Sequence, residues 1–195
     1  MKKNYKRFLF LIPLGLFLID YLLIVTEIIK PLDQLVFSFL NLIANDYLTA
    51  FFKTITHLGS FIGISIVIVL ILFWRFKIGL VCLIASLVQQ GINRGLKEII
   101  QRPRPVISLI NESGYSFPSG HAMAITCLYG LIIYYLWQSD LKYRKGLCVI
   151  SALIIVIVLI SRVYLGVHYF SDVLGGFLLS LSIVLYIGHI PSWQA

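Results

Sequence analysis

Long apolar runs separated by short polar gaps dominate the hydrophobic pattern of this chain. Six of these runs approach the roughly 20 residues that a helix needs to cross a bilayer. The first, Phe8 to Val25, and the fifth, Leu147 to Ile160, are nearly free of charge. We therefore predict an all-α, polytopic membrane protein: a bundle of six transmembrane helices forming one domain over residues 1–195. The expected spans are residues 7–26, 58–75, 77–96, 120–138, 146–164 and 171–190.

Polar positions interrupt this pattern in two places. Gln89, Gln90, Asn93 and Arg94 lie near the end of the third run, so this end should face protein or water rather than lipid. Residues 31–56 mix apolar and polar positions, which is typical of one or two short helices lying in the membrane interface. We expect such interfacial helices between the first two spans.

Composition supports the membrane interpretation and removes two others. With 59% hydrophobic and 12% charged residues, the chain is too apolar for a soluble domain of its size. The net charge of +8 does not indicate nucleic-acid binding, because the Lys and Arg residues fall in short gaps and not along one polar face. Cys82, Cys127 and Cys148 lie in apolar runs without CxxC spacing, so buried thiols are favoured over a disulfide or a metal site.

The first run follows four basic residues, as in a signal peptide, but it is long and no small-x-small cleavage pattern follows it. We interpret it as a retained helix. Asp20 is an acid within this helix, and a polar contact inside the bundle is favoured over a direct functional role. The four basic residues are Lys2, Lys3, Lys6 and Arg7.

An even number of spans places both termini on the same side of the membrane. The short turns at 75–77 and 139–146 belong to that side and are strongly basic. Because basic short loops stay in the cytoplasm, we expect a multi-pass protein of the cell membrane with cytoplasmic termini. The remaining polar segments, and the active site that they suggest, then face the extracytoplasmic side.

Three of these outward gaps hold residues suited to binding phosphate. Lys97, Arg104 and Arg162 are cations beside a low-dielectric medium, which is unfavourable unless an anion neutralises them. A phosphate dianion fits, since guanidinium groups match its oxygens. Ser119 and Gly120 open a helix whose first N–H groups lack helical partners and favour an anion.

Histidines complete the set. His168 and Asp172 are four residues apart, so the carboxylate can fix the imidazole tautomer and leave the other ring nitrogen free to attack. His121 can supply the proton that a leaving group needs. Each residue alone has an ordinary explanation, such as a structural histidine, a helix cap or a headgroup anchor. Their coincidence favours a nucleophile, an orienting group and an acid around one phosphate.

In chain order, these residues form three motifs: K-x6-RP from Lys97 to Pro105, PSGH from Pro118 to His121, and SR-x5-H-x3-D from Ser161 to Asp172. The motifs resemble the three-part signature of the type 2 phosphatidic acid phosphatase family. With the six-span pattern, the resemblance covers nearly the whole chain. It implies a phosphohistidine at His168, acid catalysis by His121, orientation of His168 by Asp172, and no metal ion or other cofactor.

The resemblance therefore implies a membrane lipid phosphatase. Phosphatidylglycerol phosphate is slightly favoured as substrate over undecaprenyl diphosphate. The expected partners are a phosphorylated lipid and the bilayer, with no nucleic acid and no obligate protein partner. Two alternatives stay open: a vanadate-dependent haloperoxidase-like enzyme, whose cage would hold vanadate, and a phospholipid-binding or transporting protein without a hydrolytic step.

Several residues near these motifs have weaker interpretations. Glu112, in the loop 106–117, could contact a headgroup, but a solvated loop charge is favoured. His57 could border the site, although a structural hydrogen bond is preferred. Gly175 and Gly176 are expected to permit close helix packing.

Overall fold

The computed structural model describes residues 8–190, which form helices and connecting loops without a strand. The predicted all-α class is therefore confirmed. The helices are α1 (Leu11–Val25), α2 (Lys30–Leu42), α3 (Asp46–Ile55), the 3-10 helix η2 (Thr56–Gly59), α4 (Phe61–Trp74), α5 (Phe76–Ile100), α6 (Gly120–Gln138), α7 (Arg144–Tyr164) and α8 (Phe170–Ile187).

Four of these helices, α5 to α8, are long and apolar enough to cross a bilayer by themselves. The helices α1 and α4 are shorter, at 15 and 14 residues. Each of these two belongs to a bent pair: α1 meets α2 at 94°, and the segment from α3 to η2 meets α4 at 52°. The described residues thus supply four spans, or six when each bent pair is counted as one, in agreement with the predicted membrane bundle.

The observed helix boundaries lie close to the predicted spans, with one informative difference. The bounds of α6 are those predicted, whereas α5 continues to Ile100, past the predicted end at residue 96. Lys97 therefore lies in the last turn of a helix and not in a gap. Gln101 follows the last residue of α5 as its C-cap and adopts a left-handed conformation with φ of 51°, shortly before Pro103. The predicted start of the first span at residue 7 lies outside the described residues.

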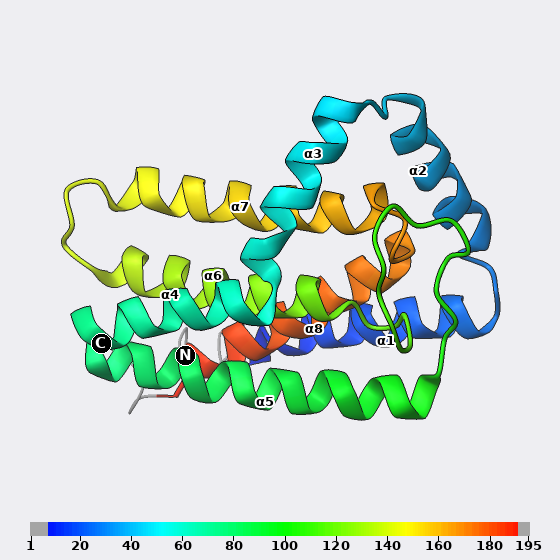
Figure 1. Cartoon of the computed structure of the whole chain (residues 1–195). Helices are drawn as coiled ribbons and strands as arrows, with labels where there is room; N and C mark the ends of the chain where they lie inside the picture. The colour runs from blue at the N-terminus through cyan, green and yellow to red at the C-terminus, as the bar shows by residue number, and fades with distance from the viewer. Residues whose placement is uncertain (1–7, 191–195) are drawn as a thin grey trace.

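The mixed segment 31–56 forms the two short helices α2 and α3, as the sequence indicated. Asn45 caps α3 by accepting a hydrogen bond from the Leu48 amide at 2.9 Å. Large apolar side chains of these helices remain exposed, among them Leu35 at 66% and Phe39 at 61%. In Figure 1, α2 and α3 arch over one end of the bundle, where such side chains can contact the membrane interface.

The polar segments of the sequence meet at that same end of the bundle. Helices α5 and α7 end there and α6 and α8 begin there, while the long loop 101–119 covers it (Figure 1). The basic turns around Arg75 and at residues 139–143 lie at the opposite end. The fold thus separates a polar, loop-covered end from a basic end with short turns.

Helix α6 forms the centre of the packing, because its side chains are buried against α5, α7 and α8. Cys127, Leu128 and Leu131 on this helix have no exposed surface. Cys82 and Cys148 on the neighbouring helices are also buried, and all three cysteines are free, which confirms the predicted buried thiols. By contrast, the outer helices keep exposed apolar side chains such as Phe73, as expected where lipid replaces water.

A close contact between α8 and the start of α6 depends on Gly176. A Cβ atom at this position would lie 2.8 Å from the Ser119 carbonyl oxygen and 3.1 Å from the Ala122 Cβ. At Gly175 a Cβ would lie 2.5 Å from the Phe117 ring. The expectation that this glycine pair permits close helix packing is confirmed, and the contact fixes the PSGH segment against α8.

We predict that Gly176→Ala destabilises the protein by about 1–3 kcal/mol, because the added methyl group overpacks a backbone contact. Thermal unfolding in detergent should show a lower Tm. Gly91→Ala is the matched control in a neighbouring helix, since a Cβ at Gly91 meets nothing within 4 Å. Equal melting temperatures for the two variants would contradict the tight α6–α8 contact.

Candidate active site

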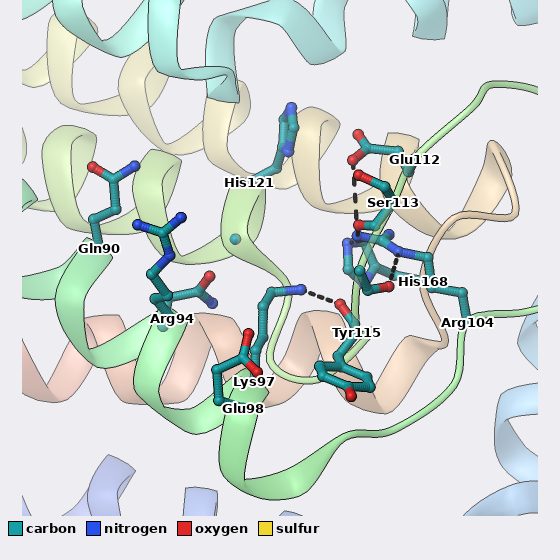
Figure 2. Close-up of a pocket in the computed structure, with 13 residues that line it drawn as sticks. Gln90, Arg94, Lys97, Glu98, Arg104, Glu112, Ser113, Tyr115, His121 and His168 are labelled. Carbon is teal, nitrogen blue, oxygen red and sulfur yellow. Dashed lines mark hydrogen bonds and ion pairs between the residues drawn. The ribbon is translucent and has the colours of Figure 1, made fainter.

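A cavity of about 420 Å³ opens at the loop-covered end of the bundle, between α5, the loop 101–119 and the start of α6 (Figure 2). Five of the predicted site residues line it, although they come from separate parts of the chain: Lys97, Arg104, Gly120, His121 and His168. The other lining residues are Gln90, Asn93, Arg94, Glu98, Glu112, Ser113, Gly114 and Tyr115.

The three remaining predicted residues lie directly behind the cavity wall, and each has no exposed surface. Arg162 contacts Glu112, and Asp172 lies behind His168. The Ser119 hydroxyl caps α6 by accepting a hydrogen bond from the Ala122 amide at 3.4 Å. The Ser119 N–H donates to the Asp172 carbonyl at 3.0 Å, so the expectation that this N–H is available to an anion is wrong.

His168 lies in the short loop between α7 and α8, with its side chain 2% exposed. Its Nδ1 atom is 3.5 Å from Asp172 Oδ2, and its Nε2 atom is 3.3 Å from Arg104 Nη1. A proton on Nδ1 would therefore point to the carboxylate, which leaves the lone pair of Nε2 beside the cation. This is the arrangement that a nucleophilic imidazole needs.

Burial lowers the pKa of His168 from 6.5 to about 4, and the cations Arg162 and Arg104 act in the same direction. The Asp172 carboxylate opposes this shift but does not cancel it. The imidazole is therefore neutral at pH 7 and keeps the lone pair required for attack.

Lys97 and Arg104 hold the loop that covers the cavity. Arg104 donates from Nε to the Gly114 carbonyl and from Nη2 to the Ser113 carbonyl, both at 3.0 Å. Its Nη1 donates to the Val167 carbonyl at 2.8 Å. Lys97 Nζ donates to the Tyr115 carbonyl (Figure 2). Both cations thus sit at the cavity wall with peptide oxygens as partners.

Glu112 neutralises the buried cations. Its Oε1 atom lies 2.6 Å from Arg162 Nη2, and its Oε2 atom lies 3.8 Å from Arg104. Burial alone would raise the pKa of Glu112, but Arg162, His121 and Arg104 outweigh burial and lower it, so the carboxylate stays charged. The favoured interpretation of Glu112 as a solvated loop charge is therefore wrong. A buried arginine needs a permanent counter-ion, and this need is the signal by which the sequence could have identified Glu112.

A second group of contacts, behind Asp172, was missed by the sequence analysis. Arg102 Nη1 lies 2.6 Å from Asp172 Oδ1, and Arg102 Nη2 lies 2.9 Å from Asp33 Oδ2. The Ser116 hydroxyl also donates to Asp172 Oδ2. Asp33 comes from α2, 139 positions before Asp172 and in a segment of mixed composition, so no local pattern joined the two.

Two weaker expectations are not met. Asp20 is 3% exposed, yet neither of its carboxylate oxygens has a hydrogen-bond partner among residues 8–190, so the expected polar contact is absent there. The His57 side chain is exposed and makes no hydrogen bond within the described part of the chain, and it does not line the cavity.

A second cavity, of about 180 Å³, adjoins the first and lies between α4, α5 and α6. The two share Gln90, Asn93, Gly120 and His121 as lining residues. Most of the other side chains around the second cavity are apolar: Phe61, Ile64, Ile68, Leu83, Leu87 and Ala124. The polar cavity thus adjoins a smaller, mostly apolar cavity that lies among the membrane helices.

Comparisons with known proteins agree with this geometry. The sequence model of the PAP2 superfamily matches residues 76–194. Phosphatidylglycerophosphatase B of Bacillus subtilis (strain 168) is 39% identical over 181 residues, which cover 87% of this chain and 89% of that protein. An undecaprenyl-diphosphatase of Sulfolobus acidocaldarius is 30% identical over 129 residues, or 62% of this chain and 59% of that protein.

A solved structure is also similar over most of its length. The crystal structure of a transmembrane PAP2-type phosphatidylglycerolphosphate phosphatase from Bacillus subtilis matches with a TM-score of 0.84 and 36% sequence identity. The match covers 92% of this chain and 93% of that chain. The similarity therefore includes α1 to α4, which lie before the region matched by the superfamily model.

We predict that the His168 imidazole titrates with a midpoint of about 4, because its burial disfavours the charged form. Histidine labelled with ¹³C at Cε1 can be followed by NMR in detergent between pH 3 and 9. The His168 resonance is identified by its loss in His168→Asn, with His57→Asn as the control that should leave it in place. A midpoint at 6.5 or above would contradict the buried, neutral imidazole.

Proposed function

We propose that this chain, which belongs to the PAP2 superfamily and is a lipid phosphatase of the PAP2 type, transfers phosphate from its substrate to His168. The proposed reaction uses no metal ion. The observation that carries this proposal is the placement of His168. Its Nδ1 faces Asp172 while its Nε2 lies beside Arg104 at the cavity wall. This placement supports a proton on Nδ1, which would leave the lone pair of Nε2 free to attack a phosphate in the cavity.

In the first step, the lone pair of His168 Nε2 attacks phosphorus and the bond from phosphorus to the lipid oxygen breaks. His121 donates a proton to the departing oxygen, which leaves a phosphohistidine and a dephosphorylated lipid. Asp172 stabilises the positive charge that develops on the His168 ring. Lys97 and Arg104, which line the cavity, neutralise the charge on the phosphoryl oxygens, and Arg162 adds positive charge from behind the cavity wall.

In the second step, His121 accepts a proton from a water molecule while that water attacks phosphorus. The bond from phosphorus to His168 Nε2 breaks and inorganic phosphate leaves. The imidazole regains its lone pair, so the protein returns to its starting state.

The donor set supports a reaction without a metal ion. Within residues 8–190, no group of three His, Cys, Asp or Glu side chains is arranged to hold one. The positive charge at this site comes instead from one lysine and two arginines, and guanidinium groups stabilise phosphoryl oxygens well. Two of the carboxylates at this site, Glu112 and Asp172, are already paired with these cations or with His168.

Phosphatidylglycerol phosphate is the substrate that we favour. The similarity to phosphatidylglycerophosphatase B extends over most of both chains, and the apolar second cavity gives a lipid tail a place beside the phosphate. Undecaprenyl diphosphate is the second candidate, supported by the shorter match to an undecaprenyl-diphosphatase. These relatives favour hydrolysis over the haloperoxidase-like and non-hydrolytic alternatives.

We also propose that the active site opens on the extracytoplasmic side of the cell membrane. The basic turns lie at the opposite end of the bundle from the cavity. Since short basic loops remain in the cytoplasm, this separation supports the orientation with cytoplasmic termini.

We predict that the purified protein, in detergent with EDTA, forms a phosphohistidine when it is mixed with ³²P-labelled lipid phosphate. The label should be stable in base and lost in acid, and His168→Ala should lack it. Phosphate release by this variant should fall by about 10³-fold or more, because the nucleophile is gone. His57→Ala is the matched histidine control and should retain label and turnover. Full turnover by His168→Ala would overturn the mechanism.

A substrate panel under the same conditions tests the proposed lipid. We expect kcat/KM to be highest for phosphatidylglycerol phosphate, lower for undecaprenyl diphosphate and lowest for p-nitrophenyl phosphate, which has no tail to fill the apolar cavity. The measurement is phosphate release at several lipid-to-detergent ratios. A preference for the polyprenyl substrate would reverse our assignment, and a preference for the soluble ester would argue against the lipid cavity.

A further inference from the structure

Arg102 lies between two buried carboxylates behind the nucleophile. Its Nη1 atom donates to Asp172 Oδ1 at 2.6 Å and to Ser171 Oγ at 2.8 Å, and its Nη2 atom donates to Asp33 Oδ2 at 2.9 Å. The guanidinium also lies over the Tyr169 ring, with its carbon 4.3 Å from the ring centre. Asp33 is 2% exposed and Asp172 has no exposed surface, so both ion pairs are shielded from water.

Asp33 also binds the start of the helix that carries Asp172. Its Oδ1 atom accepts from the Ser171 amide at 2.8 Å, and its Oδ2 atom accepts from the Ser171 hydroxyl at 2.7 Å. A carboxylate at a helix N-terminus accepts hydrogen bonds from free N–H groups and interacts favourably with the positive end of the helix dipole. The interfacial helix α2 is thereby joined to the first turn of α8, next to His168.

We propose that Asp33 and Arg102 are positioning residues, which act through Asp172 to set the orientation and the proton affinity of His168. The proposal deepens the function proposed above, since it takes His168 to be the nucleophile. Neither residue lines the cavity, so their effect must pass through Asp172 and not through contact with the substrate.

The geometric part of the argument concerns the Asp172 carboxylate. Arg102 holds Oδ1, while Oδ2 accepts from the Tyr169 amide at 2.8 Å and from the Ser116 hydroxyl. These contacts fix the plane of the carboxylate and leave Oδ2 toward His168 Nδ1. Without Arg102, one oxygen would lose its charged partner and the carboxylate could rotate away from the imidazole.

The electrostatic part concerns the balance of charge. Arg102 partly neutralises the charge of Asp172. Asp172 therefore stabilises the protonated, positively charged form of His168 less than it would without Arg102. Asp33 in turn partly neutralises Arg102. Loss of the Arg102 charge should therefore raise the proton affinity of His168, while loss of the Asp33 charge should lower it. The two changes act through the same ion pair in opposite directions.

Other ionisable groups face His168 and Asp172 from the surrounding elements, and they are the same in every variant considered below. The opposite signs therefore arise from the Asp33–Arg102 pair. These groups are Asp20 from α1, Lys97 from α5, Arg104 and Glu112 from the loop 101–119, His121 from α6, Arg162 from α7, and Tyr169 beside His168.

The test is the NMR titration of His168 in Arg102→Gln and Asp33→Asn. We expect the midpoint to rise by about one pH unit in Arg102→Gln and to fall by about half a unit in Asp33→Asn. At pH 4 the Asp33→Asn ring should thus be more neutral than the wild-type ring. In turnover assays both variants should lose kcat with little change in KM, and Arg102→Lys should restore the wild-type midpoint and part of kcat.

Glu27→Gln and Lys30→Gln are the matched controls. These residues form an exposed ion pair of 3.5 Å next to and at the start of α2, and their loss should leave the midpoint and turnover unchanged. Midpoints that move in the same direction in Arg102→Gln and Asp33→Asn, or that stay in place in variants with a wild-type Tm, would overturn the proposal. If Arg102→Gln does not fold, a lower midpoint in Asp33→Asn together with a wild-type midpoint in Arg102→Lys supports the proposal, and an unchanged or higher midpoint in Asp33→Asn overturns it.

The titration does not require turnover, so this proposal and the proposed function can fail separately. Full hydrolysis by His168→Ala would show that His168 is not the nucleophile. It would not change the measured effect of Asp33 and Arg102 on the His168 midpoint. Conversely, Arg102→Gln and Asp33→Asn could leave the His168 midpoint unchanged while the wild-type protein still forms an acid-labile ³²P label on His168. This result would support the mechanism and overturn the positioning role of Asp33 and Arg102.

Discussion

The neutralisation of buried cations is the constraint on which the rest of this site depends. Arg162 has no exposed surface and lies among apolar helices, where an isolated charge is strongly unfavourable. Glu112 and Thr56 accept from its two terminal nitrogens. Glu112 lies in the loop after α5, and its contact with Arg162 requires this loop to fold back over the end of the bundle. Figure 1 shows the loop in that position. The cavity follows from this folding.

The helical pattern was readable from the sequence, and so were five of the residues that line the cavity. Apolar runs of membrane-spanning length identify helices, and histidines or arginines at their polar ends identify a site. The partners of these residues were not readable in the same way. Glu112, Arg102 and Asp33 have ordinary local surroundings, and their meaning arises from contacts 50 to 138 positions away. Periodicity reports which face of a helix is buried, but it does not report which charges meet.

The same limit explains the smaller differences at helix ends. Polarity near Lys97 suggested that the helix had ended, but those polar side chains line the cavity and the helix continues beneath them. At Ser119 the sequence indicated a free N–H group, but the close approach of α8 places the Asp172 carbonyl against it. Near Lys97 the local sequence was compatible with a helix end or with its continuation, and at Ser119 with a free or a bonded N–H group. In both cases tertiary contacts determined which of the two occurs.

The contacts of Lys97 and Arg104 with loop carbonyls have a consequence for the catalytic cycle. Both cations already donate hydrogen bonds to the carbonyl oxygens of residues 113–115. A bound phosphate must share these donors with the peptide groups, so inorganic phosphate gains less than it would from cations with no other partner. In the mechanism proposed above, this weaker binding of inorganic phosphate would favour its rapid release from the cavity.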